Sequence, residues 1–330
     1  MKILVIFTGG TIGSVIEDSW ISVNSDAKYK LIETYTKKYQ DNETIFDTVS
    51  PYYILSENLS SGELTKLYKC INDNLSGDYH GIIVTHGTDT LQYTSSAMGL
   101  EFPEVRIPVV FVSSAYPLEN PLENGSDNFE SAVKFIKTQS GCGVFVSYKN
   151  GFENKTNIHI ATRLKAHAES SADIFSIDNN PYAFVDNDVV LNDKFYKSSS
   201  GKSIDFSEFC SCPEILMIES MPGNIYNYNL DTCNAVILSP YHSATLDVDN
   251  ENFRRFCIDA KEKGIPVFLV NVPSGLRYES VKKLEELNII SLPYCSKIAT
   301  YMKCWIAISA GVDVREYVLK PVAQEFVENV

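Results

Sequence analysis

The N-terminal stretch Lys2-Ile3-Leu4-Val5-Ile6-Phe7-Thr8-Gly9-Gly10-Thr11-Ile12-Gly13 decides the fold that we expect for this chain. A mostly apolar run leads directly into a turn of threonine and glycine. Such a short, continuous run is typical of a strand that is buried on both faces of a parallel sheet. In an open α/β sheet, the loops at the carboxyl ends of the strands line the ligand crevice. We therefore predict that the turn at residues 8–13 borders a binding site.

A second turn of the same kind, Thr85-His86-Gly87-Thr88-Asp89-Thr90, follows the apolar run Gly81–Val84. It places a hydroxyl and a carboxylate side by side, in Thr88 and Asp89. If both runs are neighbouring parallel strands, the two turns face one cleft and supply a nucleophile and a base. Asp89 could equally cap a helix that starts near Thr90. His86 could act as a general base, although a histidine between an apolar strand and a glycine is more often structural.

Thr11 is the first candidate nucleophile, because a threonine hydroxyl reacts when an adjacent base and a desolvated setting activate it. Gly9 and Gly10 allow the backbone to approach a ligand closely and expose peptide N–H groups, which could bind a developing oxyanion. The alternative is a plain strand–helix turn in which the threonine is a cap and the glycines form a bend.

The order of apolar runs and helical patterns predicts an α/β protein. In the first half we expect strands at Lys2–Phe7, Tyr52–Leu55, Gly81–Val84, Ile107–Val112 and Gly143–Tyr148, and helices at Asp26–Tyr39, Gly62–Leu75, Leu91–Gly99 and Asn128–Thr138. Exposed strands follow at Asn157–Ala161 and Phe184–Leu191. Strands separated by helices of this length imply βαβ units and a parallel sheet.

A serine-rich stretch, Lys197–Ser203, separates this part from a second α/β series. There we expect strands at Glu214–Glu219, Ala235–Leu238, Pro266–Val270 and Ile289–Ser291, and helices at Asn250–Lys263, Tyr278–Leu287, Cys295–Ser309 and Val314–Glu325. The predicted organisation is a larger N-terminal catalytic α/β domain at 1–195, whose parallel-type sheet is flanked by helices, a linker at 196–212, and a smaller C-terminal α/β domain at 213–330. A chain of 330 residues exceeds the usual size of a single core.

The bulk composition favours an enzyme with a small substrate. The net charge of −14, from 42 acidic and 28 basic residues, argues against nucleic acid or an anionic membrane as the main partner. The first apolar run is too short for a signal peptide and leads into the threonine turn, so we expect a cytoplasmic location. We expect most of the eight scattered cysteines to be buried free thiols.

A dinucleotide-binding fold is the main alternative that starts from the glycines. It requires Gly-x-Gly-x-x-Gly after the first strand, whereas this chain has Thr8-x-Gly10-x-x-Gly13. Glu33 stands at the distance of a ribose-binding acid, but it lies in a helical pattern. This alternative also leaves the second threonine turn unexplained.

Three motifs together resemble the bacterial L-asparaginase family, including the glutaminase-asparaginases. They are Thr-Gly-Gly-Thr-Ile at 8–12, His-Gly-Thr-Asp-Thr at 86–90 and Lys165-Ala166-His167, and the order of elements agrees over nearly the whole chain. The resemblance implies hydrolysis of L-asparagine to L-aspartate and ammonia, as in asparagine catabolism, by a cytoplasmic homo-oligomer, either a dimer or a homotetramer. It implies no metal and no organic cofactor.

The resemblance also implies a role for each site residue. Thr11 takes the place of the primary nucleophile that forms an acyl-enzyme, and Thr88 takes the place of the second catalytic threonine, which works with Asp89 and Lys165. Asp89 would also hold the substrate's α-amino group.

The segment Leu55–Leu59 resembles the family's substrate-binding loop. There Ser56 would bind the α-carboxylate of the substrate and Glu57 would face its α-amino group, although an ordinary loop is the alternative for both. Glu occurs at that position in members that also accept glutamine, so a side activity on L-glutamine stays open.

Three regions depart from the family's pattern. The window in which a lid tyrosine is usual holds Ile21-Ser22-Val23-Asn24, with Trp20 before it and Tyr29 after it. The usual Ser-Asp-Gly before a helix is replaced by Glu123–Asp127. A second-domain loop that is usually Gly-x-Gly-Asn, and that completes the site of a neighbouring subunit, is Tyr241-His242-Ser243-Ala244. These departures concern the range of substrates.

Two other functions stay open at this point. One is an amidase or glutaminase acting on another amide, such as the glutaminase subunit of an archaeal tRNA-dependent amidotransferase, although those proteins usually begin with an extra domain. The other is a non-catalytic amino-acid sensor that keeps the pocket. A sensor has no need of the pair Thr88 and Lys165, which favours the enzyme.

Overall fold

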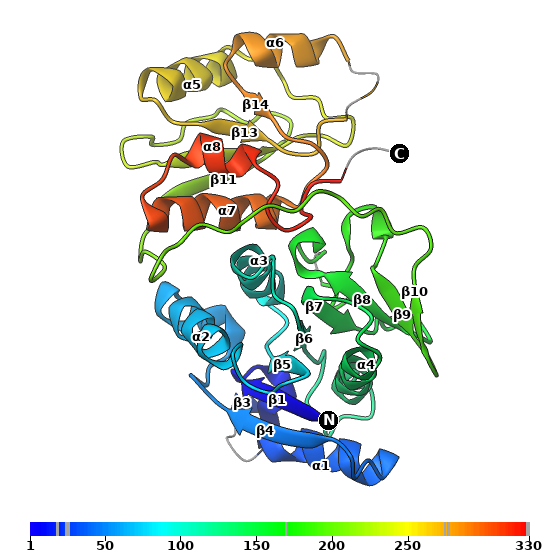
Figure 1. Ribbon diagram of the computed structural model, residues 1–330. Helices are drawn as coiled ribbons and strands as arrows, with labels where there is room; N and C mark the ends of the chain where they lie inside the picture. The colour runs from blue at the N-terminus through cyan, green and yellow to red at the C-terminus, as the bar shows by residue number, and fades with distance from the viewer. Residues whose placement is uncertain (18–19, 24–26, 169, 274, 276–277, 328–330) are drawn as a thin grey trace. The chain divides into compact units, whose positions relative to one another are not determined.

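The computed structural model describes residues 1–17, 20–23, 27–168, 170–273, 275 and 278–327, and the α/β fold class is confirmed (Figure 1). The chain divides into two compact units, Met1–Phe195 and Tyr196–Val330. The stretch 196–212, which we expected to be a linker, is grouped with the second unit.

The first unit contains an eight-stranded sheet in the order β10-β9-β8-β7-β6-β5-β1-β4. Its strands are β1 (Lys2–Phe7), β4 (Ile45–Val49), β5 (Gly81–Thr85), β6 (Pro108–Val112), β7 (Gly143–Tyr148), β8 (Thr156–Ile160), β9 (Ala183–Val185) and β10 (Val189–Leu191). The strands from β4 to β7 run parallel, and β8, β9 and β10 are joined antiparallel. This half of the chain therefore follows the predicted parallel-type sheet, with an antiparallel extension at one edge.

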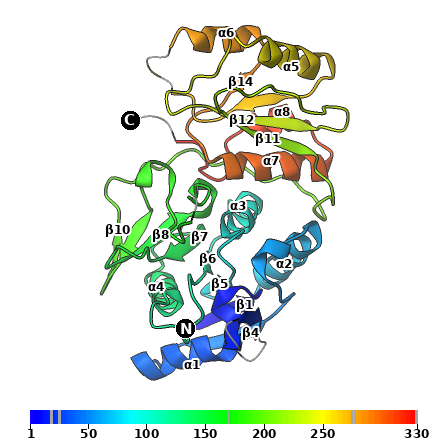
Figure 2. The ribbon, with the colours of Figure 1, turned by 180° about the vertical axis from the view of Figure 1, so that it is seen from behind.

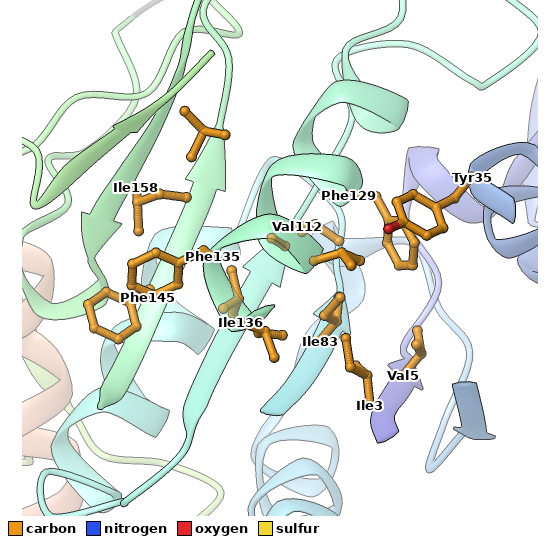
Figure 3. Close-up of a cluster of buried hydrophobic side chains, with 14 of the residues drawn as sticks. Ile3, Val5, Tyr35, Ile83, Val112, Phe129, Phe135, Ile136, Phe145 and Ile158 are labelled. Atoms are coloured by element: carbon orange, nitrogen blue, oxygen red, sulfur yellow. The ribbon is translucent and has the colours of Figure 1, made fainter. Parts of the chain in front are cut away.

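Helices cover both faces of this sheet. They are α1 (Ala27–Tyr39), α2 (Ser61–Asn74), α3 (Leu91–Glu101) and α4 (Gly125–Thr138). Figures 1 and 2 show α1 and α4 on one face and α2 and α3 on the other. Beneath α1 and α4, the buried side chains of the central strands form a continuous apolar cluster, in which Phe129 and Phe135 pack on Ile83 and Phe145 (Figure 3).

The second unit contains a four-stranded parallel sheet in the order β11-β12-β13-β14. Its elements are β11 (Ile215–Glu219), β12 (Ala235–Ser239), α5 (Glu251–Glu262), β13 (Val267–Leu269), α6 (Ser280–Glu286), β14 (Ile290–Ser291), α7 (Lys297–Ala310) and α8 (Val314–Leu319). Alternate residues of β12 face opposite cores: Val236 packs with α5 and α6, and Ile237 packs with α7 and α8.

The strand that we expected to be exposed at Asn157–Ala161 is β8, and all five of its residues are buried. Three further predicted elements were wrong in position or extent. The strand expected at Tyr52–Leu55 is instead β4 (Ile45–Val49), an edge strand whose half-exposed polar residues hide the pattern of a buried run. The strand expected at Phe184–Leu191 is a hairpin, β9 and β10, that reverses over Asp186–Asp188. The helix expected at Val314–Glu325 ends at Leu319, because Pro321 cannot continue it.

The cysteines are all free thiols, but most are not buried as we expected. Three of the eight are buried, Cys257, Cys295 and Cys304, whereas Cys142 and Cys212 are exposed. Within the described ranges, no helix is long and apolar enough to cross a membrane.

Candidate active site

The two threonine turns lie at the same edge of the sheet of the first unit. Strands β1 and β5 are parallel neighbours in a register that pairs Phe7 with Thr85, so both strands end together. The Thr8 hydroxyl donates a hydrogen bond of 2.6 Å to the Thr85 carbonyl oxygen and joins the two turns at their base. This arrangement follows from the parallel pairing that the sequence predicts.

The first turn is held against the loop after β4 by backbone bonds. The Gly10 N–H donates to the Ile54 carbonyl at 3.0 Å, and the Ile54 N–H donates to the Thr8 carbonyl at 3.1 Å. Gly9 and Gly10 have φ values of +104° and +77°, and a Cβ at Gly9 would stand 2.2 Å from the Ile54 oxygen. No side chain other than hydrogen is compatible with this packing.

Close backbone packing also brings the second turn, residues 86–90, against the first turn and the loop after β4. A Cβ on Gly10 would stand 2.3 Å from the Gly87 nitrogen, and a Cβ on Gly87 would stand 2.4 Å from the Ser56 Oγ. The Thr90 hydroxyl donates to the Ser56 carbonyl at 2.9 Å. The structure therefore packs the turn 8–13, the turn 86–90 and the loop around Ser56 together at one point.

The two candidate catalytic threonines, Thr11 and Thr88, are partly exposed at this packing. Thr11 begins a short 3-10 helix, Thr11–Gly13, and it is half-buried, as is Thr88. Neither hydroxyl has a hydrogen-bond partner among the residues that the structure describes. Asp89 is exposed and directly follows Thr88.

The two residues of the predicted substrate loop differ in exposure. Ser56 is 5% exposed and Glu57 is exposed, and both lie in the 3-10 helix Ser56–Asn58. The contact between Ser56 and Gly87 brings Ser56 to the second turn. Glu57 is open to solvent at the same loop.

Lys165 lies on a different segment, and the structure does not bring it into contact with Thr88 or Asp89. It is exposed, and its Nζ donates a hydrogen bond of 3.1 Å to the Asn179 Oδ1, not to Thr88 or Asp89. The same segment nevertheless contacts the second turn, because the His167 Nε2 lies 2.9 Å from the Thr88 carbonyl oxygen. The sequence predicted no role for Asn179, and none for His167, although His167 is the last residue of the motif Lys165-Ala166-His167.

His86 is buried in the core beneath the second turn. It is 2% exposed, its Nδ1 lies 2.8 Å from the Gly87 carbonyl oxygen, and burial lowers its pKa to about 4. A neutral imidazole enclosed in this way supports the turn and favours the structural interpretation over the general base.

A hairpin of β2 (Ser14–Glu17) and β3 (Trp20–Val23) occupies the place of the expected lid. Asn24, which falls in the window considered for the lid tyrosine, lies outside the described residues. Tyr29 is in α1 and is 49% exposed. A different tyrosine reaches the first turn: the Tyr53 hydroxyl donates to the Gly13 carbonyl at 2.7 Å.

The loop Tyr241–Ala244 of the second unit, which differs from the family's usual pattern, forms a tight turn. The Ala244 N–H donates to the Tyr241 carbonyl at 2.9 Å, and the Tyr241 N–H donates to the Thr245 carbonyl at 3.1 Å. Ala244 has a φ of +58°, a conformation that glycine adopts more readily, while His242 is exposed.

The structure bears on the alternative sites in two ways. Glu33, the candidate ribose ligand, is an exposed residue in the interior of α1 and forms an ion pair with Lys37. In the part of the chain that the structure describes, no group of three or more His, Cys, Asp or Glu side chains is arranged to hold a metal ion.

Comparisons with known proteins agree with the motifs. A family model described as "Asparaginase, N-terminal" matches residues 2–196. An L-asparaginase of Thermococcus kodakarensis is 24% identical over 324 residues, which cover 96% of this chain and 95% of that protein. A glutamyl-tRNA(Gln) amidotransferase component from Thermoplasma acidophilum is 35% identical over 143 residues, which cover 42% of this chain and 34% of that protein.

Solved structures share the fold over the whole length. The thermostable L-asparaginase from Thermococcus kodakarensis superimposes with a TM-score of 0.81 at 22% identity and covers 100% of both chains. L-asparaginase I from Vibrio cholerae gives a TM-score of 0.80 at 21% identity and covers 99% of both chains.

Proposed function

This chain belongs to the asparaginase family and is an amidohydrolase, and we propose that it hydrolyses L-asparagine to L-aspartate and ammonia. The observation that carries the proposal is the packing of Gly10 against Gly87 and of Gly87 against Ser56. This packing brings both threonine turns and the candidate substrate loop to one point, as a nucleophile, its activating groups and a substrate carboxylate require.

In the proposed reaction, the Thr11 hydroxyl oxygen attacks the carbon of the substrate's side-chain amide. The hydroxyl proton passes to the catalytic pair, the Thr88 hydroxyl and the Lys165 amine, and from this pair to the leaving nitrogen. The C–N bond then breaks and ammonia departs. Water then attacks the resulting ester, and its proton returns to Thr11 as L-aspartate leaves. The steps are those of acyl transfer through an activated hydroxyl.

Peptide N–H groups of the glycine-rich turns are the proposed donors to the oxyanion that forms during each attack. Ser56 would bind the substrate's α-carboxylate, while Asp89 and Glu57 would face its α-amino group. The exposed carboxylates of Asp89 and Glu57 support this assignment, because a cationic ammonium requires an accessible anionic partner.

An ammonia-release assay on L-asparagine tests the proposed function directly. We expect turnover by the wild type and a fall in kcat of at least about a thousandfold in Thr11→Ala, with binding of L-aspartate retained. The matched control is Thr138→Ala, an exposed threonine at the end of α4, which should turn over normally. A folded wild type that releases no ammonia would refute the proposal, and an active Thr11→Ala would remove Thr11 as the nucleophile.

The match to the amidotransferase component supports a second candidate, an amidase or glutaminase that acts on another amide. Glu57 is the residue that we propose to influence this choice. Glu57→Gln should lower the ratio of glutamine to asparagine turnover, because the neutral side chain changes how the longer substrate's ammonium is held. An unchanged ratio would exclude Glu57 from specificity, and binding of aspartate without ammonia release from either amide would favour the sensor.

We further infer a cytoplasmic homo-oligomer, a dimer or tetramer, in which the Tyr241–Ala244 loop completes the site of a neighbouring copy. The support is the family's general organisation and the compact, ordered turn of this loop. Light scattering on the purified protein tests the mass, and a monomer that is fully active would overturn the inference.

A further inference from the structure

We propose that His167 is a positioning residue for Thr88, which it holds through the Thr88 carbonyl, and this inference rests on the proposed catalytic role of Thr88. The His167 Nε2 and the Thr88 carbonyl oxygen are 2.9 Å apart, although the residues are separated by 79 positions in the chain. The contact joins the segment that carries Lys165 to the second threonine turn.

The chemistry of the contact fixes the role of the imidazole. A carbonyl oxygen can only accept, so the Nε2 carries the proton and donates it, which selects one tautomer of the neutral ring. Protonation of the other nitrogen would leave this donor in place. The contact therefore calls for a hydrogen-bond donor at one position and not for a base.

The same carbonyl also belongs to the backbone of the turn. It accepts the Leu91 N–H at 3.3 Å, at the point where α3 begins. Because the peptide group of Thr88 is held from two sides, its orientation is fixed, and the orientation of the Thr88 side chain follows from that of its backbone. Without His167, only the longer hydrogen bond from the Leu91 N–H would hold the Thr88 carbonyl.

The segment that carries His167 has a rigid base. Leu164 pairs with Ser176 as an antiparallel bridge, and the Lys165 N–H donates to the Phe175 carbonyl at 2.9 Å. The buried Ser176 Oγ lies 2.7 Å from the Nδ1 of the buried His159, which is on β8. The sheet therefore anchors this segment, and His167 transmits that anchoring to Thr88.

Kinetics of three variants test the proposal. His167→Ala should lower kcat roughly tenfold to a hundredfold with little change in KM, since a positioning bond is lost. His167→Gln should keep kcat within a few-fold of the wild type, because its amide nitrogen can donate from nearly the same place. The control His80→Ala removes an exposed histidine beside the amino end of β1, the opposite edge of the sheet, and should leave kcat unchanged.

Two kinetic outcomes would overturn the proposal. If His167→Gln were as impaired as His167→Ala and lost the acid limb of the pH–rate profile, His167 would be an acid–base group. If His167→Ala kept the kcat of the wild type, the contact would have no functional part. Thermal unfolding of each variant separates these outcomes from misfolding.

Hydrogen exchange tests the contact without reference to turnover. The Leu91 amide, which donates to the same Thr88 carbonyl, should exchange faster in His167→Ala than in the wild type, and His167→Gln should restore its protection. A wild type that releases no ammonia would refute the proposed function, whereas unchanged exchange in His167→Ala would refute this inference by itself.

Discussion

The two threonine turns and the Lys165–His167 segment are fixed by opposite means. The turns are held by backbone packed on backbone, where Gly10 meets Gly87 and Gly9 meets Ile54 with no room for a Cβ. Among the described residues, the segment is paired with the rest of the fold by its backbone only at its start, at Leu164 and Lys165. Beyond that point two side-chain hydrogen bonds hold it, from Lys165 to Asn179 and from His167 to Thr88. The positions of the candidate catalytic threonines are thus determined by the fold itself, whereas the position of the Lys165 side chain depends on a replaceable group, Asn179.

This difference predicts which substitutions alter both stability and activity and which alter kinetics alone. Changes in the turns should alter stability and activity together, because the same atoms hold the core and the site. Changes in the segment should alter kinetics with little effect on stability, because its partners lie near the surface. Substitutions in each region test that division.

Gly10→Ala should have the largest effect. Gly10 has a φ of 77° and a ψ of −178°, a region that is almost exclusive to glycine, and its added Cβ would stand 2.3 Å from the Gly87 nitrogen. We expect a loss of about 3 kcal/mol or more in the free energy of unfolding, measured in urea, together with loss of activity.

Gly223→Ala is the matched control for this change. Gly223 has a φ of +78°, but nothing lies within 4 Å of its added Cβ, so it isolates the conformational effect. We expect it to cost about 1 kcal/mol and to leave turnover intact. Equal losses at both positions would show that the contact between the turns contributes nothing.

Acid should destabilise the first unit through its two buried histidines. Burial lowers the pKa of His86 to about 4 and that of His159 to about 3, while both titrate near 6.5 when unfolded. Below pH 6.5 the unfolded chain therefore binds protons that the folded chain does not, and stability falls as the pH falls toward 4. His86 alone should contribute about 3 kcal/mol that is present above pH 6.5 and lost by about pH 4.

The measurement is the free energy of unfolding at several pH values. Near pH 5.5, above the range of most carboxylates, the slope should correspond to an uptake of about two protons on unfolding. A stability that is constant between pH 7 and pH 5 would mean that these imidazoles are not held neutral by burial.

The sequence was most informative where burial dominates. The runs that became β1, β5, β6 and β7 are apolar because helices cover both faces of the sheet, so their pattern is unambiguous. Edge strand β4 has one paired side and polar residues such as Asp47, and its pattern was therefore missed. The two strands of the hairpin β9–β10 are short and partly exposed, so the polar residues between them did not stand out as a turn, and they were predicted as a single strand.

The candidate site divides in the same way. Thr11, Thr88 and Asp89 follow predicted strands, so the topology places them at one edge without further information. The contacts of His167 and Asn179 join irregular loops and a short 3-10 helix, Ile177–Asn179, and the spacing of these residues in the chain does not predict that they meet in space. Tyr53 was missed because it follows an edge strand that was itself misplaced.

Tyr53→Phe should have a moderate effect. The Tyr53 hydroxyl donates to the Gly13 carbonyl next to the first threonine turn, and burial raises its pKa to about 12, so it remains a donor at neutral pH. Loss of this bond should cost about 1 kcal/mol of stability and lower kcat/KM severalfold. The control is Tyr79→Phe, which loses a hydrogen bond to Asp47 of β4 and touches neither threonine turn. It should cost a similar amount of stability and leave the kinetics unchanged.

Asn179→Asp should have the smallest effect and should change kinetics alone. Asn179 accepts the Lys165 Nζ at 3.1 Å, and both residues are exposed. An aspartate keeps the acceptor but adds a negative charge, which would hold the Lys165 Nζ more firmly at residue 179 and so away from the second turn. Because exposed ion pairs are weak, kcat/KM at pH 7 should fall by no more than about fivefold.

The control at the same position is Asn179→Gly. Asn179 has a φ of +50°, which glycine adopts freely, so this variant removes the side-chain acceptor without straining the backbone. It should lower kcat/KM less than Asn179→Asp, since it adds no charge. If both variants lowered kcat/KM equally, or neither did, Asn179 would not position the Lys165 side chain, and the contrast between the rigid turns and the adjustable segment would rest on His167.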